Sequence, residues 1–392
     1  MGLAKDYDHF AAEYVDDPYA FWKRLREEEP VARSDKYGGF HVVSRYADIV
    51  EAAQDTERFS SADGDGIPPL PMVGMIPIDI DPPAHRDYRA IINPALTVNA
   101  ARKHEDRIRA LAVELIDPLV GQQEFEVSST VATVMAPKAT LSFVGFPEED
   151  HELMIKATDD VTRLRGTETP RVAEAGMEMF QTATKLVMAR REQASDSSDE
   201  DDLLRLLIEG EFQGRKLADQ EIVMNLMVLL FGAVDTTASA INGALYYLAT
   251  HPEDQEQLRK AGEVPNLALE ELIRWSSPLQ GLGRTVTQDT ELGGCPLSKG
   301  DRVLLHWASG NRDDAQFSAP DDVDLERKPN KHLGFGMGPH RCVGVHFGKL
   351  MLKVTIEEFL ARIPSFELAD ETQLKWLGGE ARGLRNLPLK LA

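Results

Sequence analysis

The segment "HLGFGMGPHRCVG", His332 to Gly344, contains four glycines, one proline and one of only two cysteines in the 392-residue chain. Such a cysteine is a buried structural side chain, a nucleophile or a metal ligand, and each role requires different neighbours. The glycines permit tight turns, so that backbone N–H groups after Cys342 can point at the sulfur. If the last helix begins at Cys342, its N-terminal amides also stabilise a negative sulfur. Phe335 could then cover the thiolate and exclude water.

The neighbouring residues give two of the three roles little support. A nucleophilic cysteine needs a histidine held near its sulfur, and nothing in the sequence orients His340, two residues away, as a base. A zinc site needs further ligands, and no second Cys/His pair has zinc-ligand spacing. A buried structural cysteine beside a turn stays open at this point.

The composition is that of an acidic globular protein, with 42% hydrophobic residues and a formal net charge of −22. Nucleic-acid binding needs clustered cations, so this charge argues against a nucleic-acid partner. Two cysteines cannot build a disulfide framework, which suits a reducing cytoplasm. The N-terminal residues include no apolar run, and the longest uncharged apolar stretch, Ile222 to Val234, has thirteen residues, too few to span a bilayer. We therefore expect a cytoplasmic protein with no membrane segment.

Helical periodicity dominates the sequence, and a minor β component accompanies it. Apolar spacing predicts helices near 100–116, 128–144, 148–164, 171–193 and 218–250, and a last helix from Cys342 to about Ile363. Short β segments are expected near 30–60, 276–310 and 365–392, including Phe40–Ser44 and Arg302–Ala308. No linker divides the chain, so we expect one large domain over residues 1–392.

Two segments lack regular periodicity. Gly64 to Pro83 holds six prolines among apolar residues, and it is either a loop packed on the core or a loop lining a pocket for an apolar ligand. The acidic run from Asp196 to Asp202 predicts a solvated loop between two helices.

The pattern Phe335-Gly336-x-Gly338-x-His340-x-Cys342-x-Gly344 resembles the haem-binding loop of the cytochrome P450 family. The resemblance extends over nearly the whole chain, from about Pro18 to the C-terminal residues. It implies the cytochrome P450 fold, with haem b (iron protoporphyrin IX) bound and the Cys342 thiolate as the iron ligand. It also assigns Phe335 and Gly344 to the cofactor site.

A pair of charged residues one helical turn apart, Glu271-x-x-Arg274, precedes the β segments and the cysteine loop. Glu256-x-x-Arg259 has the same spacing, and such a pair usually only supports a surface helix. Its position makes the second pair similar to the structural Glu–Arg pair of the family. The resemblance therefore gives Glu271 and Arg274 a structural role in holding the loop region.

An aspartate interrupts the apolar helix predicted over 218–250, which is costly unless the carboxylate is paired or functional. Pairing with a cation is one reading. In the other, Asp235-Thr236 resembles the acid–alcohol pair with which the family relays protons to bound dioxygen. Gly232 and Ala233 are small and leave space beside the iron, where the family usually has Ala-Gly. Thr236 could bond to the carbonyl of Gly232 and open the helix there.

Haem propionates need positively charged or hydrogen-bonding partners. His85 and Arg89 are four residues apart and share a helical face, and they resemble the family's propionate-binding helix. Arg284 and His340 match two further propionate ligands. Each of the four could separately be an ordinary charged or polar residue, but together they fit one cofactor.

The resemblance implies that apolar residues line a substrate pocket, drawn from 67–76, from 165–182, and from Val228, Phe231, Gly232, Leu279, Gln280 and Leu282. We therefore expect a monooxygenase that inserts one oxygen atom of O2 into a C–H bond of a small to mid-sized hydrophobic molecule. A haem-thiolate peroxygenase or isomerase, which has less use for a proton relay, and a non-catalytic haem sensor are the alternatives.

No flavin, nicotinamide or iron–sulfur signature is present, so electrons from NAD(P)H must arrive through an external partner. An acidic ferredoxin, expected to be of the 2Fe–2S type, with its reductase fits this requirement, and we expect the chain itself to be a monomer. The proposed docking patch consists of five basic residues: Arg102, Lys103, Arg341, Lys349 and Lys353.

Overall fold

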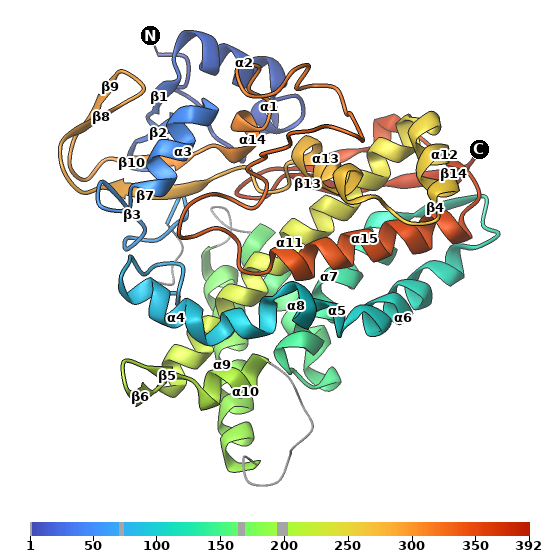
Figure 1. The fold of residues 1–392 in the computed structure, drawn as a ribbon, viewed down its shortest axis with the longest axis horizontal. Helices are drawn as coiled ribbons and strands as arrows, with labels where there is room; N and C mark the ends of the chain where they lie inside the picture. The colour runs from blue at the N-terminus through green and yellow to red at the C-terminus, as the bar shows by residue number, and fades with distance from the viewer. Residues whose placement is uncertain (1, 70–73, 164–168, 194–202) are drawn as a thin grey trace.

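Helices form most of the molecule, and most of the strands lie in the upper half of the view, as expected of a mainly α protein with a minor β part (Figure 1). The computed structural model describes residues 2–69, 74–163, 169–193 and 203–392. The α-helices are α1 Ala12–Val15, α2 Tyr19–Glu28, α3 Tyr46–Gln54, α4 Ala84–Ile92, α5 Val98–Arg102, α6 Glu105–Ile116, α7 Thr133–Val144, α8 Glu148–Arg163, α9 Thr169–Gln193, α10 Leu203–Glu209, α11 Asp219–Thr250, α12 Pro252–Ala261, α13 Asn266–Ser276, α14 Trp307–Gly310 and α15 Val345–Arg362.

The strands are β1 Val31–Ser34, β2 Phe40–Val43, β3 Phe59–Ser60, β4 Glu124–Glu126, β5 Glu211–Phe212, β6 Arg215–Lys216, β7 Leu282–Val286, β8 Thr290–Leu292, β9 Cys295–Leu297, β10 Arg302–Leu305, β11 Phe366–Leu368, β12 Lys375–Leu377, β13 Gly383–Asn386 and β14 Pro388–Leu391. The three predicted β regions are confirmed. Strand β4 and the small hairpin formed by β5 and β6 are not predictable from the sequence, since each of these strands has only two or three residues.

The largest sheet has five strands in the order β1-β2-β10-β7-β3. Strand β10 pairs in parallel with β2 and antiparallel with β7, and this register places Val303 beside Arg284. All four residues of β2 are buried, which explains why this short apolar segment is readable as a strand. Arg284 therefore lies on strand β7, which is held between β10 and β3, and its side chain is buried.

Helix α11, 32 residues long, runs through the middle of the molecule and packs against α7, α9, α13 and α15 (Figure 1). By length and composition it is the one helix in the described part of the chain that could cross a membrane, with 50% of its most apolar window buried. Its place in the main hydrophobic core accounts for this composition, because a helix surrounded by others is apolar on several faces.

Two predicted helix boundaries are wrong. The expected helix over 100–116 is interrupted at Lys103 and His104, where i to i−3 hydrogen bonds replace the α-helical ones. The break lets the His104 ring pack edge-on against Phe143 and Phe347. The last helix begins at Val345 and not at Cys342, so the cysteine lies in the loop before its first turn.

The buried pair of α13 ties the fold to the cysteine loop. Glu271 and Arg274 are both fully buried and joined by two 2.8 Å contacts. Arg274 also donates to the carbonyl of Asn311, whose side chain accepts a hydrogen bond from the Leu333 amide at 2.6 Å. Arg327 donates to the same Glu271 carboxylate. The pair therefore fixes the segment that leads into the loop.

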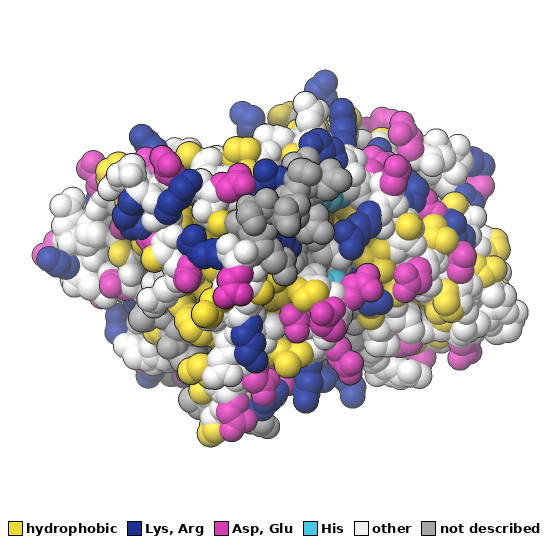
Figure 2. Space-filling model, turned by 90° about the horizontal axis from the view of Figure 1, so that it is seen from below, with side chains coloured by type: hydrophobic (Ala, Val, Ile, Leu, Met, Phe, Trp, Pro, Cys, Tyr) yellow, Lys and Arg dark blue, Asp and Glu magenta, His cyan; other side chains and the backbone are white. Residues whose placement is uncertain are grey.

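The surface carries charges of both signs. Figure 2 shows the face seen from below, where acidic and basic side chains alternate with hydrophobic ones and no broad basic field forms. The acidic run over 196–202, predicted to be a solvated loop, lies outside the described residues.

Candidate functional site

The cysteine loop folds as a series of tight turns. Gly336 and Gly338 have φ angles of +68° and +76°, which favour glycine. Gly338 also passes so close to another segment that a Cβ atom there would stand 2.1 Å from the carbonyl oxygen of Ala53. The Cys342 amide then donates to the Phe335 carbonyl at 2.9 Å. The glycines therefore have the backbone role that the sequence predicts for them.

The thiol of Cys342 lines an internal cavity together with Phe335 and Gly344. Burial raises the pKa of this thiol, while the Gly344 amide and the charges of Arg89 and Arg341 act in the opposite direction. Because α15 starts at Val345, the predicted stabilisation by a helix beginning at the cysteine itself is replaced by these local contacts. The two cysteines are free, and no cluster of His, Cys, Asp or Glu in the described ranges could hold a metal ion.

Four basic or potentially basic side chains converge on the same cavity: His85, Arg89, Arg284 and His340. The rings of His85 and His340 lie 4.2 Å apart, and neither His85 nitrogen has a hydrogen-bond partner although the residue is buried. Burial, followed by neighbouring arginines, lowers the pKa of His85 to about 4. Burial and then Arg284 lower that of His340 to about 2.

Among the described residues, no carboxylate contacts the two arginines of this group, although Asp65 and Asp81 lie near enough to Arg284 to oppose the lowering of its pKa by burial. Arg284 is 2% exposed and donates to the carbonyl of the adjacent Gly283. Arg89 donates to the carbonyl of Arg341 at 3.0 Å. Within the described residues neither guanidinium forms an ion pair with a carboxylate. Buried cations without anions are costly, so this wall is built for an anionic ligand.

Helix α11 supplies the opposite side of the cavity. The Thr236 hydroxyl donates to the Gly232 carbonyl at 2.7 Å, as the sequence predicts, and Asp235 precedes it along the cavity lining. A Cβ atom at Gly232 would have no heavy atom within 4 Å, so open space adjoins the helix there. The Thr236 hydroxyl, the Asp235 carboxylate and the open space at Gly232 therefore lie within one stretch of α11.

Apolar side chains line the rest of the cavity, and Val228, Phe231, Leu279 and Leu282 are among them, as predicted. The prediction for Gln280 is wrong. This residue is buried outside the lining, and its side-chain amide donates to the Ser277 carbonyl at 2.8 Å. Successive side chains of an extended segment alternate in direction, so Leu279 faces the cavity and its neighbour does not.

The two predicted pocket segments contribute less than expected. Of the residues described in 67–76, only Met75 lines the cavity, and residues 70–73 lie outside the described ranges. None of residues 169–182 lines it, and residues 164–168 are again not described.

Sequence reasoning missed several lining residues. They include Phe10 near the N-terminus, Thr140 and Phe143 on α7, and the turn Gly378–Ala381 between β12 and β13. Only the Gly378-Gly379 pair marks this turn in the sequence, and it does not show that the turn reaches the cavity. Phe10 had none, because long-range packing alone brings it to the cavity.

A family model described as "Cytochrome P450" matches residues 148–376. Cytochrome P450-terp of a Pseudomonas species is 30% identical over 96% of this chain and 94% of its own length. Linalool 8-monooxygenase of Pseudomonas putida is 30% identical over 95% of both chains. The solved structure of cytochrome P450 CYP109Q5 from Chondromyces apiculatus has a TM-score of 0.87 at 29% identity, covering 99% of this chain and 98% of that one.

The chain belongs to the cytochrome P450 family.

As a cytochrome P450, the chain is a haem-dependent monooxygenase that uses molecular oxygen, with the cytochrome P450 fold. The residues that line the cavity fit a haem, independently of the sequence comparisons. A haem presents two carboxylates, and the partnerless His85 nitrogens and the buried Arg284 stand where carboxylates are needed. The thiol of Cys342 lines the same space and is accessible from it. The structural-cysteine and nucleophile readings of Cys342 leave these polar groups unexplained.

Proposed function

We propose that this cytochrome P450 hydroxylates a compact hydrophobic organic molecule, with the roles of its residues as follows. The supporting observation is one continuous lining in which the Cys342 thiol, the Thr236 hydroxyl and apolar side chains of α11 and β7 share a cavity. An apolar cavity with few polar groups selects hydrophobic ligands and orients them weakly. Terpenoid or aromatic compounds fit this description.

Cys342 would bind the haem iron, and His85, Arg89, Arg284 and His340 would bind the propionates. When bound, the haem supplies the iron that activates dioxygen. The Gly344 amide tunes the sulfur, and Phe335 covers it. The positions of these residues support the assignment, since the thiol and the four basic groups line one cavity and each lacks a competing strong partner.

Asp235 and Thr236 would hold and pass protons. Hydroxylation with dioxygen takes up two electrons and two protons and yields the alcohol and one water molecule. A carboxyl group beside a hydroxyl can give up a proton and take back another from solvent. The 2.7 Å bond from Thr236 to Gly232 fixes the hydroxyl at the cavity wall. This geometry supports a relay in which Thr236 is the last protein group.

The two electrons would come from NAD(P)H through a ferredoxin and its reductase. Two residues of the predicted docking patch carry less free charge than expected: Lys349 pairs with Glu270, and Lys353 with Glu263 and Glu357. We therefore centre the patch on Arg102 and Arg341, which are exposed. Charge reversal at Arg102 should slow reduction by ferredoxin, and unchanged reduction kinetics would remove the patch from the proposal.

We further propose that the protein is a cytoplasmic monomer with a single domain over residues 1–392. The burial of α11 within the main core supports the absence of a membrane span, and that core links residues from Ile76 to Leu389. Sedimentation at equilibrium tests the monomer, and limited proteolysis tests the single domain.

A screen of apolar small molecules for the low-to-high spin conversion of the haem tests the substrate class. Apolar terpenoid or aromatic compounds should convert the spin state, whereas their carboxylated analogues should not, because no cation in the described lining lies outside the proposed propionate group. Failure of every apolar compound, with conversion by charged ones, would overturn the assignment. Product analysis with ferredoxin, reductase and NAD(P)H then identifies the hydroxylated carbon.

A further inference from the structure

The N-terminal segment, residues 2–16, reaches the substrate-facing side of the cavity. In the described part of the chain, Phe10 is the one lining residue that precedes Asp65. Its side chain is half-buried, as expected of a ring at the edge of a cavity. One residue of the first ten therefore adds apolar surface to a site that is otherwise built from residues after position 64.

Buried side chains hold this segment in place. Tyr7 is 2% exposed, and its hydroxyl lies 3.1 Å from Nε2 of His306. The Ser34 hydroxyl donates a hydrogen bond to the Tyr7 carbonyl at 2.8 Å. The Phe10 amide donates to the Asp8 carboxylate at 2.9 Å. Because the backbone before Phe10 is fixed by these contacts, the ring has a defined position at the cavity.

The same segment packs against the turn at 378–381. The Gly379 amide donates to the His9 carbonyl at 2.8 Å, and a Cβ atom at Gly379 would stand 2.8 Å from Cε1 of Phe10. A Cβ atom at Gly378 would overlap the carbonyl oxygen of His9. The two glycines are therefore required by the close approach of the N-terminal backbone and of the Phe10 ring.

The other edge of the turn pairs with the segment at 278–280. The Arg382 amide donates to the Pro278 carbonyl at 2.8 Å. The Arg382 side chain is buried, and its Nε donates back to the Val15 carbonyl of the N-terminal segment at 2.7 Å. The three segments thus form one hydrogen-bonded layer beside the cavity. Phe10 is the only aromatic residue that this layer contributes to the described lining.

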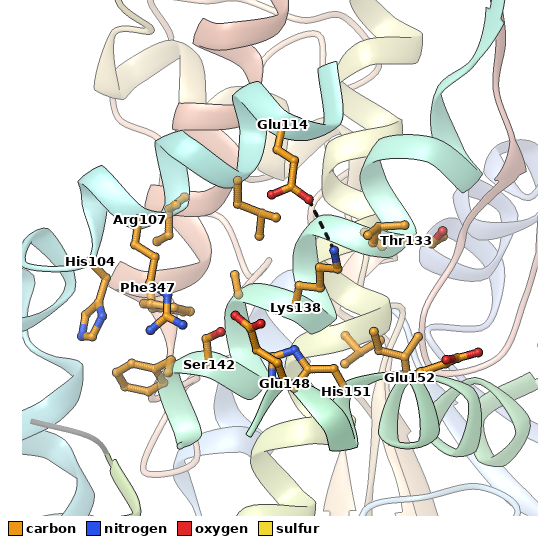
Figure 3. Close-up of a pocket in the computed structure, with 18 of the residues that line it drawn as sticks. His104, Arg107, Glu114, Thr133, Lys138, Ser142, Glu148, His151, Glu152 and Phe347 are labelled. Carbon is orange, nitrogen blue, oxygen red and sulfur yellow. Dashed lines mark ion pairs between the residues drawn. The ribbon is translucent and has the colours of Figure 1, made fainter. Parts of the chain in front are cut away.

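A second hollow of the protein differs from the cavity in its charge. It is a cleft of about 920 Å³ bounded by α6, α7, α8 and α11. Figure 3 shows the Lys138–Glu114 ion pair across it, with Arg107 and Glu148 directed into the same space. An apolar ligand there would remove water from these charges, which is costly. Since Phe10 is not in its lining, an effect of Phe10 on apolar ligands reports on the cavity.

We propose that Phe10 is a specificity-determining residue, whose ring closes the substrate-facing side of the cavity and limits the length of the apolar molecule that fits. The inference rests on the proposed function in one respect, that this part of the cavity holds the substrate. A molecule that reaches the ring gains apolar contact with it. A longer molecule has to displace the ring from its contact with Gly379.

A series of n-alkylimidazoles tests this limit in the holoprotein without turnover. The imidazole nitrogen binds the haem iron and shifts the Soret band, and the alkyl chain extends into the cavity. In the wild type, each added methylene should tighten binding about fourfold until the chain meets the ring, and affinity should then stop rising. In Phe10→Ala the rise should continue to longer chains, which should bind at least about tenfold tighter than to the wild type.

Phe21→Ala is the matched control. Phe21 is also half-buried near the N-terminus, and its ring stacks on Tyr7 at 5.4 Å, but it does not line the cavity. The variant should keep the wild-type length limit. An equal change in Phe21→Ala would assign the effect to packing of the segment and overturn the role of the Phe10 ring. Phe10→Leu replaces Phe10→Ala if the CO spectrum shows a damaged haem site.

The contact between Gly379 and Phe10 provides a second test. Gly379→Ala should displace the ring in the wild type, whereas in a Phe10→Ala background it meets no ring. The φ angle of +119° at Gly379 strains alanine equally in both backgrounds. The effect of Gly379→Ala on the affinity of the chain at the length limit should therefore differ between the backgrounds by at least about threefold. Equal effects would contradict the contact as a determinant of length.

The alkylimidazole series separates failure of this inference from failure of the proposed function. A length dependence that is the same in Phe10→Ala and in the wild type would overturn the role of Phe10 alone. Hydroxylation of apolar molecules would then still stand. Absence of a Soret shift with every alkylimidazole would contradict the proposed haem site and this inference together.

Discussion

The two sides of the cavity differ in how the sequence builds them. The side that we propose faces the haem uses polar groups at fixed spacing in three short segments, around His85, Arg284 and Cys342. The substrate-facing side collects apolar side chains from α11, β7, the N-terminus and the turn at 378–381. The first side is supported by the buried Glu271–Arg274 pair and by paired strands, whereas the second combines α11 and β7 with the N-terminal segment and the turn at 378–381. The difference indicates that the chemistry is fixed by rigid elements, while substrate choice can change with little cost to the fold.

The largest expected effect comes from the buried pair that supports the haem-facing side. Glu271→Gln leaves Arg274 and Arg327 without their carboxylate in a fully buried site and should lower the free energy of unfolding by about 3–5 kcal/mol. Glu256→Gln is the matched control, because Glu256 and Arg259 are 3.5 Å apart with side chains 50% and 21% exposed. It should cost at most about 1 kcal/mol. Urea unfolding measures both, and equal losses would contradict the distinction.

The next effect is a pH dependence of the haem-free protein. Burial holds the pKa of His85 at about 4, below its usual 6.5. As the pH falls below 6.5, His85 becomes protonated in the unfolded chain. In the folded chain it becomes protonated only near pH 4. The folded state therefore loses up to about 3 kcal/mol over this window. His85→Gln should show a shallower loss between pH 7 and 4.5 in urea unfolding, and an identical slope would refute the assignment. Haem propionates should raise this pKa and reduce the loss.

The rate of proton transfer should depend on the carboxyl group of Asp235 on α11. Asp235→Asn keeps the shape but removes the titrating group, and it should slow product formation by about 100-fold, at the lower end for general acid–base catalysis. Substrate affinity should change little. Stopped-flow turnover and spin-shift titration measure the two quantities. A parallel loss of affinity and rate would point to a structural role instead.

Haem retention should depend on Arg284. Replacement by Gln removes a buried charge-assisted partner of a propionate, worth about 2 kcal/mol or roughly 30-fold in affinity. Arg341→Gln, exposed and adjacent to the cysteine, is the control and should hold haem normally. Transfer of haem to apomyoglobin measures the release rate. Equal release from the two variants would show that Arg284 does not bind the cofactor.

The smallest effects are expected on the substrate-facing side. Phe231→Ala enlarges the cavity and should improve binding of larger apolar ligands by about 1 kcal/mol, or roughly fivefold. Gly232→Ala adds a methyl group where no protein atom lies within 4 Å, so it should weaken large ligands by a similar factor without destabilising the fold. Spin-shift titration with a size series checks both. If Gly232→Ala lowered Tm as much as Glu271→Gln, the two sides of the cavity would not differ in their importance to the fold.

The sequence predicts the haem-facing side well because its information is local. Gly338 is required by one close approach to Ala53, and His85 and Arg89 share a helical face by spacing alone. The start of α15 at Val345 was missed, because the turns that place Cys342 depend on contacts with α3 that no local pattern reveals.

The substrate-facing side is poorly predictable for a related reason. The turn at 378–381 reaches the cavity because its backbone pairs with the segment at 278–280, a contact between residues a hundred positions apart. The break at Lys103 and His104 goes together with the packing of the His104 ring against Phe143 and Phe347, which are distant in the sequence.

The spectrum of the reduced, CO-bound protein tests the central claim, that the Cys342 thiolate holds the haem iron. The wild type and the Cys295→Ser control should both give a strongly red-shifted Soret band. Cys342→His should keep haem through the four basic groups but lose that shift. A wild-type spectrum without the shift, or a shift that survives in Cys342→His, would contradict the account.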